Sequence, residues 1–181
     1  MLAHVRAWLG QMRHHARAGH SRLVVVDPAL AAKSVLELSS PAFADGARLP
    51  ERFTADGHGV SPPLIWGEVP EGTQSLALIV EDPDAPALSP LVHAIVWDIP
   101  PTERRLAEGA IVRDGDGGAD GRDVGRNSFL SAGWLPPDPP AGHVRHDYVF
   151  QPFSPEPPPP PPPTTGRAAS LAPSTNHILD A

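Results

Sequence analysis

Two carboxylates and a histidine lie close together in the middle of this chain. Asp82 and Asp84 alternate with prolines in the segment Asp82–Pro86, and His93 follows inside an apolar run. Because proline fixes φ near about −65° and excludes a helix, the carboxylates should lie on a stiff loop. A rigid acidic loop beside an inward-facing histidine predicts a small polar pocket in an apolar wall.

A second group of polar side chains follows a proline-rich loop near residue 140. If the stretch after His146 is a strand, alternation places His146 and Tyr148 on one face. The same rule places His93 on the face of Ile95 and Trp97. Each histidine alone is more often a satisfied core or edge residue. Two histidines, two aspartates and a tyrosine at junctions between loops and strands favour one shared site.

Short β-strands are predicted to position these groups. Aliphatic runs at Ser75–Glu81 and Leu91–Ile99 predict buried strands on either side of the acidic loop. Asp147–Phe153 is a further candidate strand, and Leu23–Asp27 and Val35–Ser39 are shorter ones. The chain contains 25 prolines, many of them in short loop signals, which also favours a β-rich domain.

Composition excludes several classes of protein. With 181 residues, 40% of them hydrophobic, the chain is long enough for one domain plus tails. A net charge of −7 argues against general nucleic-acid binding, and the absence of cysteine excludes disulfides and thiolate metal sites. No apolar run has the length of about 18 residues that spans a membrane, and no secretory signal is recognised. We therefore expect a cytoplasmic protein.

The two ends of the chain differ from its middle. Residues 2–18 have the spacing of a short basic amphipathic helix, expected to dock on the domain rather than on a membrane or partner. His14, His15 and His20 could bind a metal, but a solvated face is the simpler interpretation.

The run Pro157–Pro163 predicts a polyproline II rod within a solvated, disordered tail, with a ligand for a proline-binding module as the alternative. The acidic loop at residues 114–125 fits neither frame of a calcium-binding EF-hand loop.

An ordered series of motifs resembles the phosphatidylethanolamine-binding protein family, and more narrowly its bacterial Raf-kinase-inhibitor-like branch. The matching segments span roughly residues 35–153: Phe53–Gly57, Val60–Leu64, Asp82–Pro86 with His93, Gly125–Phe129, Gly133-Trp134, Pro139–His143 and Tyr148–Phe150. The resemblance divides the chain into an N-terminal extension (1–33), a C-terminally incomplete domain (34–153) and a proline-rich tail (154–181).

The resemblance implies an all-β, β-rich fold: two antiparallel sheets in a sandwich, short helices, and a small anion pocket at one end. Such pockets take phosphate, acetate or a phospholipid head group such as phosphoethanolamine. Carried over by motif, the ligand-binding residues are Asp82, Asp84, Pro86, His93, Gly133, His146 and Tyr148, with no metal and no cofactor. The imidazoles would donate to the anion, with a carboxylate behind each favouring the cation. Asp82 and Asp84 would mainly orient the histidines and backbone amides.

Binding without turnover is the expected activity, because no nucleophile with an adjacent base is evident. Metal-dependent phosphoester hydrolysis by Asp82, Asp84, His93 and His146 is the alternative. The resemblance also implies a regulator that inhibits kinases or proteases, with an unknown partner.

Two residues depart from the family pattern. Asp147 stands where the family usually has a basic residue, and it would weaken anion binding if its side chain faced the pocket. Proline at position 152 limits the last strand to an edge or bulge, and the likeness is expected to stop there, which leaves a truncated, non-functional member as a further alternative.

Overall fold

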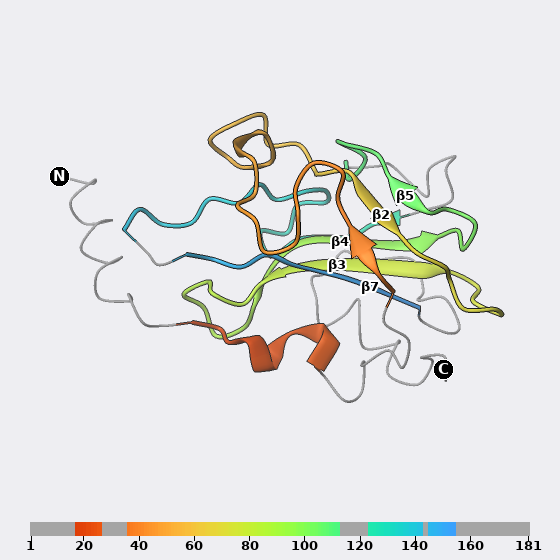
Figure 1. The fold of residues 1–181 in the computed structure, drawn as a ribbon. Coiled ribbons are helices and arrows are strands. Elements are labelled where there is room, and N and C mark those ends of the chain that lie inside the picture. The colour runs from red at the N-terminus through yellow and green to blue at the C-terminus, as the bar shows by residue number, and fades with distance from the viewer. Residues whose placement is uncertain (1–16, 27–35, 113–122, 143–144, 155–181) are drawn as a thin grey trace.

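The computed structural model describes residues 17–26, 36–112, 123–142 and 145–154, which consist mainly of strands and turns (Figure 1). Helix within these ranges is limited to three short 3-10 turns: η1 (His20–Arg22), η2 (Val24–Val26) and η3 (Glu51–Phe53). The β-rich fold class predicted from the sequence is confirmed.

Seven strands form two antiparallel sheets in the described part of the chain. The smaller sheet has the order β1-β2-β5 and the larger one β6-β4-β3-β7. The strands are β1 (Leu38–Ser39), β2 (Leu64–Trp66), β3 (Leu76–Asp82), β4 (Leu91–Ile99), β5 (Arg105–Leu106), β6 (Asp123–Val124) and β7 (Val149–Phe153). The strand predicted at Leu91–Ile99 is confirmed as β4, and the one predicted at Ser75–Glu81 is shifted by one residue in β3.

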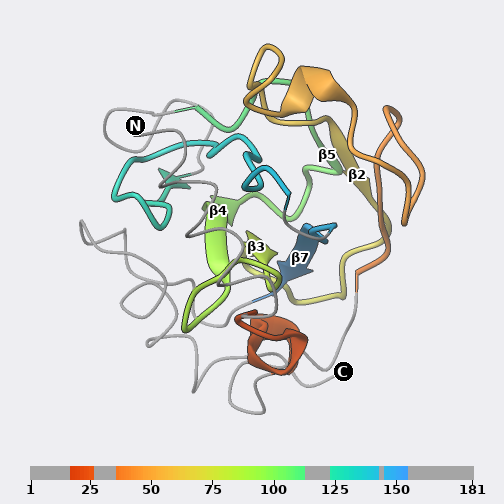
Figure 2. The same cartoon turned by 90° about the vertical axis from the view of Figure 1, so that its left-hand side faces the viewer.

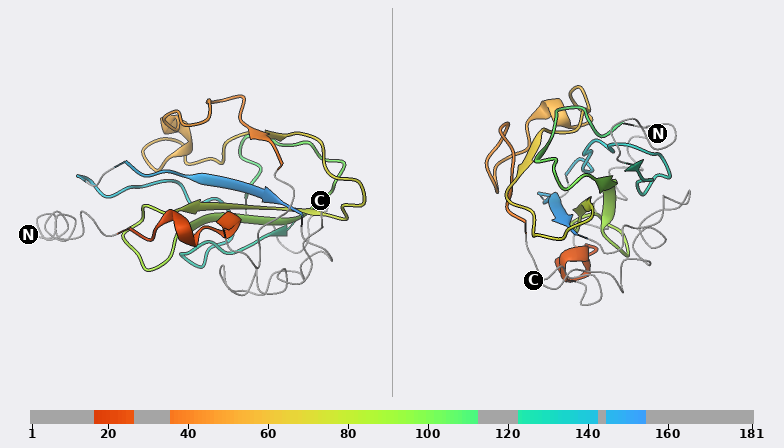
Figure 3. Two further views of the ribbon diagram at one scale, coloured as in Figure 1. Left: turned by 60° about the horizontal axis from the view of Figure 1, so that its bottom comes forward. Right: turned by 90° about the vertical axis from the view of Figure 1, so that its right-hand side faces the viewer.

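The space between the sheets holds the main hydrophobic core. Figure 1 and both panels of Figure 3 show β2 and β5 on one side of β3 and β4. This layer contains residues from both sheets: Leu64 and Trp66 of β2, Leu106 of β5, Leu76, Leu78 and Val80 of β3, and Ala94, Val96 and Ile99 of β4. Because the central strands are apolar on both faces, they must be covered on both sides.

A second cluster lies on the opposite face of the larger sheet. It comprises Val24, Ala77, Ile79, Val92, Ile95, Trp97 and Phe153. The N-terminal segment, residues 17–26, runs along this face (red in Figures 1 and 3). The sandwich therefore has a third, partial layer made by residues that precede the motif-bearing domain.

The strand predicted at Leu23–Asp27 is wrong, because this region forms the 3-10 turn η2. Three consecutive valines favour a strand, but the backbone N–H of Val24 donates to Oε2 of Glu81 at 2.9 Å instead of joining a ladder. Tertiary context thus overrides β propensity here. At Val35–Ser39 only Leu38–Ser39 forms a strand, paired with β2.

The last described strand confirms the constraint expected from Pro152. β7 begins at Val149, two residues later than predicted, and pairs only with β3 within the described sheet. Pro152 lies opposite Leu78 on this edge strand. An edge position tolerates the missing N–H because the proline nitrogen can face away from the ladder.

Several predictions concern parts of the chain outside the described residues. These are the amphipathic helix up to residue 16, most of the acidic loop at 114–125 and the tail from residue 155 onward. Among the residues that are described, no helix has the length and apolar character needed to cross a membrane.

Candidate functional site

The segment Asp82–Pro86 leaves β3 at one end of the sandwich, the end that faces the viewer in Figure 2. Asp82 is 3% exposed and ends β3 opposite Leu91. Its Oδ1 accepts the backbone N–H of Asp84 at 2.8 Å, and its Oδ2 lies 2.7 Å from Nδ1 of His146. One carboxylate thereby holds both the loop and an imidazole ring, which is the orienting role proposed from the sequence.

A β-bulge places His93 at this end of the core. The register between β3 and β4 shifts between Val80 and Glu81, so that His93 lies between two paired positions without a partner of its own on β3. The alternation that would put His93 on the face of Ile95 and Trp97 is therefore broken, and that prediction is wrong. Bulges commonly re-aim a side chain beside a functional site.

The hydrogen bonds of His93 define its tautomer. Nδ1 lies 2.7 Å from the carbonyl oxygen of Leu135, and the N–H of Leu135 donates to the carbonyl of His93 at 2.8 Å. Because a carbonyl only accepts, Nδ1 bears the hydrogen and Nε2 of the neutral ring presents a lone pair. Nε2 is buried and has no hydrogen-bond partner among the described residues.

Burial lowers the pKa of His93, and the Leu135 carbonyl and the Asp82 charge oppose this only in part. The expectation of a carboxylate behind each imidazole is therefore correct for His146 and wrong for His93, where a backbone carbonyl takes that place. His93 is 2% exposed and is neutral at neutral pH.

Aromatic rings form the wall beside His93. The Tyr148 ring meets it edge-on, with centroids 5.1 Å apart, and the Trp134 ring lies 6.2 Å away. Trp134 in turn stacks on Phe150 of β7, at 6.2 Å. Burial, followed by the charges of Asp82 and other nearby carboxylates, raises the pKa of Tyr148. Its hydroxyl therefore stays protonated and able to donate.

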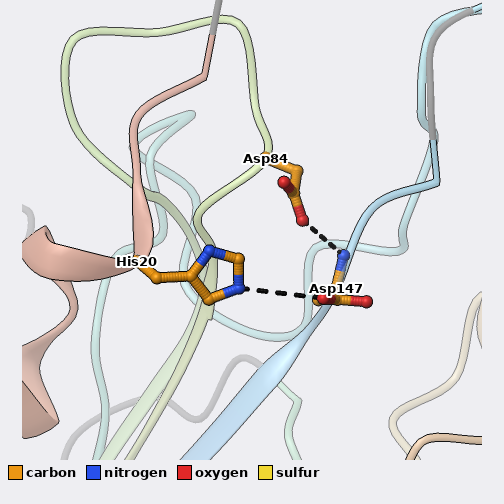
Figure 4. Close-up of side chains that lie close together, drawn as sticks. All are labelled: His20, Asp84 and Asp147. Carbon is orange, nitrogen blue, oxygen red and sulfur yellow. Dashed lines mark hydrogen bonds and ion pairs between the residues drawn. The ribbon is translucent and has the colours of Figure 1, made fainter.

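Asp84 is held by two donors from separate parts of the chain. Its Oδ1 accepts from Arg17 at 2.6 Å and its Oδ2 accepts the backbone N–H of Asp147 at 2.9 Å. Figure 4 shows the Asp147 side chain directed toward His20, and the two are 3.7 Å apart. Asp147 also pairs with Arg145 at 2.9 Å, and its side chain is 44% exposed. Its carboxylate is therefore already paired near the surface.

Two predicted residues shape the site through the backbone. Pro86 is half-buried within the loop, where its ring restricts φ. Gly133 has a φ of 109°, a conformation that favours glycine, and its carbonyl accepts from Asn127 at 3.4 Å. It helps to line a cavity of about 220 Å³ with Ser61, Ile111 and Trp134. The structure therefore brings Asp82, Asp84, His93, His146 and Tyr148 together, with Gly133 one residue from the aromatic wall.

The sequence offered Asp82, Asp84, His93 and His146 as possible metal ligands, but the cluster of potential ligands in the structure is a different one. Within the described ranges, the group of three acidic or histidine side chains whose ligand atoms all lie within 4.8 Å of one another is His20, Asp84 and Asp147 (Figure 4). Both oxygens of Asp84 already accept hydrogen bonds, from Arg17 and from the Asp147 N–H. This donor set is a partly exposed ion-pair cluster rather than a vacant ligand sphere.

Sequence reasoning missed Arg17 and did not single out Leu135. Arg17 lies 67 positions from its partner Asp84, in a segment assigned to an extension, and no local spacing signals that contact. The Leu135 backbone interaction depends on how one loop folds over β4. The family resemblance implied that the backbone of Gly133–Pro137 closes one side of the site, but not which carbonyl would face the histidine.

Comparison with known proteins shows a family that matches this geometry. The family model described as phosphatidylethanolamine-binding protein matches residues 39–180. The chain belongs to the phosphatidylethanolamine-binding protein family. The match continues through the tail, further than the resemblance was expected to reach.

The relatives and solved structures support this membership. A UPF0098 protein of Aquifex aeolicus is 38% identical over 122 residues, which cover 67% of this chain and 68% of the relative. The crystal structure of Escherichia coli YbcL, described as a new member of the mammalian family, has a TM-score of 0.71 and 32% identity, covering 81% of this chain and 93% of that one. The Chlamydia trachomatis homologue CT736 has a TM-score of 0.67 and 30% identity, covering 80% and 91%.

Proposed function

We propose that the site formed by Asp82, His93, His146 and Tyr148 binds a phosphate group, free or as a phosphoethanolamine head group, without turning it over. The buried Nε2 of His93 is the observation on which this rests most directly. A buried lone pair without a donor is costly, so a ligand that supplies the missing hydrogen stabilises the site.

A phosphate oxygen can meet Nε2 only through one proton. A phosphate monoanion brings that proton as an O–H group, whereas a dianion needs His93 to become protonated. The complex of a monoanion with neutral His93 and the complex of a dianion with protonated His93 contain the same number of protons. The site therefore binds one phosphate group together with one proton. Tyr148 supports the other oxygens as an O–H donor, since the raised pKa keeps its hydroxyl protonated.

The proposed pH dependence follows from this shared proton. The second ionisation of a phosphomonoester has a pKa of about 6, so the dianion predominates at neutral pH and above. Binding must then take up one proton, and the affinity should fall by up to about tenfold for each pH unit. Acidification should therefore strengthen binding until the monoanion predominates.

Calorimetric titration of the full chain tests this function. Inorganic phosphate and phosphoethanolamine are titrated separately at about pH 6 and about pH 8, values on either side of the phosphate ionisation. We expect binding that is weaker at the higher pH and abolished in His93→Ala. The matched control is His58→Ala, because His58 is exposed and interacts with Arg52.

The results of the titration distinguish the ligand and test the function itself. Tighter binding of phosphoethanolamine than of phosphate would assign the site to a head group, and equal binding would assign it to the phosphate alone. Absence of heat with both ligands in the wild type would refute the function. Release of phosphate from a phosphoester, lost with a chelator, would instead favour the hydrolase alternative. Cytoplasmic location and the inhibitor role remain predictions from the sequence.

A further inference from the structure

The N-terminal segment is joined to the acidic loop by its backbone. The N–H of Ala18 donates to the Ala85 carbonyl at 3.0 Å, and the N–H of Gly19 donates to the Pro83 carbonyl at 2.8 Å. These two bonds fix residues 18 and 19 against the loop. They position the side chain of the preceding residue, Arg17, against Asp84.

The ion pair between Arg17 and Asp84 is strongly asymmetric in exposure. The Asp84 side chain is 1% exposed, whereas that of Arg17 is 45% exposed, and the two atoms are 2.6 Å apart. A buried carboxylate requires hydrogen bonds and an opposite charge. Arg17 contributes the charge, and the Asp147 N–H at 2.9 Å contributes a second, neutral donor.

Two buried carboxylates beside an anion site need separate compensation. The carboxylate of Asp82 faces the imidazole of His146, with the two atoms 2.7 Å apart. His93 supplies no positive charge at neutral pH, because burial lowers its pKa. The guanidinium of Arg17 is the permanent charge that faces Asp84 in the described structure.

We propose that Arg17 is a positioning and specificity-determining residue of the pocket: by neutralising Asp84 and fixing the Asp82–Pro86 loop, it makes the site accept an anion. This inference rests on the proposed phosphate-binding function. It gives the N-terminal segment a part in ligand choice, beyond covering one face of the sheet.

Three variants of the full chain separate charge from simple support. Arg17→Gln leaves the Asp84 charge uncompensated. Arg17→Lys retains a positive charge, and the double variant Arg17→Gln/Asp84→Asn removes both charges together. Arg48→Gln is the matched control, because it makes the same change in net charge at an exposed position. A cooperative thermal transition is first verified for each variant.

Phosphate affinity is then measured at low and at high salt. We expect Arg17→Gln to bind about tenfold more weakly at low salt, the size of effect that an uncompensated neighbouring charge has on an ionic equilibrium. The loss should shrink at high salt, since the Arg17 side of the pair is exposed to screening ions. Arg17→Lys should retain most of the affinity, and the double variant should regain it although it lacks the ion pair.

The outcomes distinguish this inference from the function on which it rests. If Arg17→Gln binds like the wild type, or if the double variant remains as weak as the single one, Arg17 does not act through the charge of Asp84. Failure of Arg17→Gln to fold leaves Arg17→Lys and the double variant to decide the same point. If the wild type binds no phosphate, the function is wrong and the inference falls with it.

Discussion

At the scale of single residues, His93 and His146 illustrate how neighbours give one residue type two different roles. His146 faces a carboxylate, whereas His93 faces a carbonyl and lies deeper among aromatic rings. His93 is therefore the group whose protonation is opposed by the fold. Its sequence context, an aliphatic strand, indicated burial, but the bulge and the tautomer depend on partners far along the chain.

The lowered pKa of His93 predicts a loss of stability in acid for the unliganded protein. Below about pH 6.5 the unfolded chain takes up a proton on His93 that the folded chain does not, so the free energy of unfolding falls as the pH falls. The slope contributed by this one group is at most about 1.4 kcal/mol per pH unit. Denaturant titrations in buffers free of phosphate and acetate measure it.

His93→Gln provides the comparison, since glutamine has no proton to gain. Between neutral and mildly acidic pH its stability should fall less steeply than that of the wild type. Parallel slopes for the two proteins would mean that His93 titrates normally in the folded chain.

At the scale of elements, the N-terminal segment is attached both to the acidic loop and to β3, a central strand of the larger sheet. The second attachment is Glu81, which is fully buried in β3. Its Oε2 accepts from Val24 at 2.9 Å and from Nε2 of Gln151 in β7 at 3.0 Å. One carboxylate thus connects η2, β3 and β7.

Removing this carboxylate should destabilise the protein. Glu81→Ala leaves the buried Val24 N–H and the Gln151 amide without their acceptor, and each such group costs about 1–3 kcal/mol. Chemical denaturation should show the loss, whereas Glu71→Ala, at an exposed turn position, should be nearly neutral. A change of less than about 0.5 kcal/mol, the usual range for surface substitutions, would mean that the connection is unimportant.

The same segment shows what the sequence could and could not predict. Long apolar runs defined β3 and β4 almost to the residue, because a continuous aliphatic stretch has few alternatives to a buried strand. The strand predicted at Leu23–Asp27 is wrong, since the backbone N–H of Val24 donates to a side chain 57 positions away. The predicted pocket members converge because proline-rich loops restrict the backbone, but Arg17 has no local signature.

At the scale of the whole molecule, two sheets of unequal size share one core. Leu64 of β2 and Leu78 of β3 are 2% and 1% exposed and belong to the same cluster. The small sheet consists of short strands that are marginal alone, so its stability must come from this shared layer. The sandwich should therefore unfold as one cooperative unit.

Truncating a core leucine in either sheet should shift one common transition. Leu64→Ala and Leu78→Ala should each lower the free energy of unfolding by about 2–5 kcal/mol, with a single melting step in both cases. Calorimetry and near-ultraviolet circular dichroism can be compared for coincidence. Two separate steps in Leu64→Ala would show that the sheets unfold independently.

Within the described residues β7 is an edge strand of the larger sheet, which limits how a second chain can pair with it. Along an antiparallel strand, the backbone groups of alternate residues face opposite neighbours. Phe150 and Pro152 are alternate residues of β7, so their backbone groups face the same side of the strand. When that side faces away from β3, Phe150 offers an N–H and Pro152 does not. A second molecule that tried to extend this sheet by adding its own strand would lose half of the donors along β7. Intermolecular strand addition at this edge is therefore disfavoured by a single imino acid.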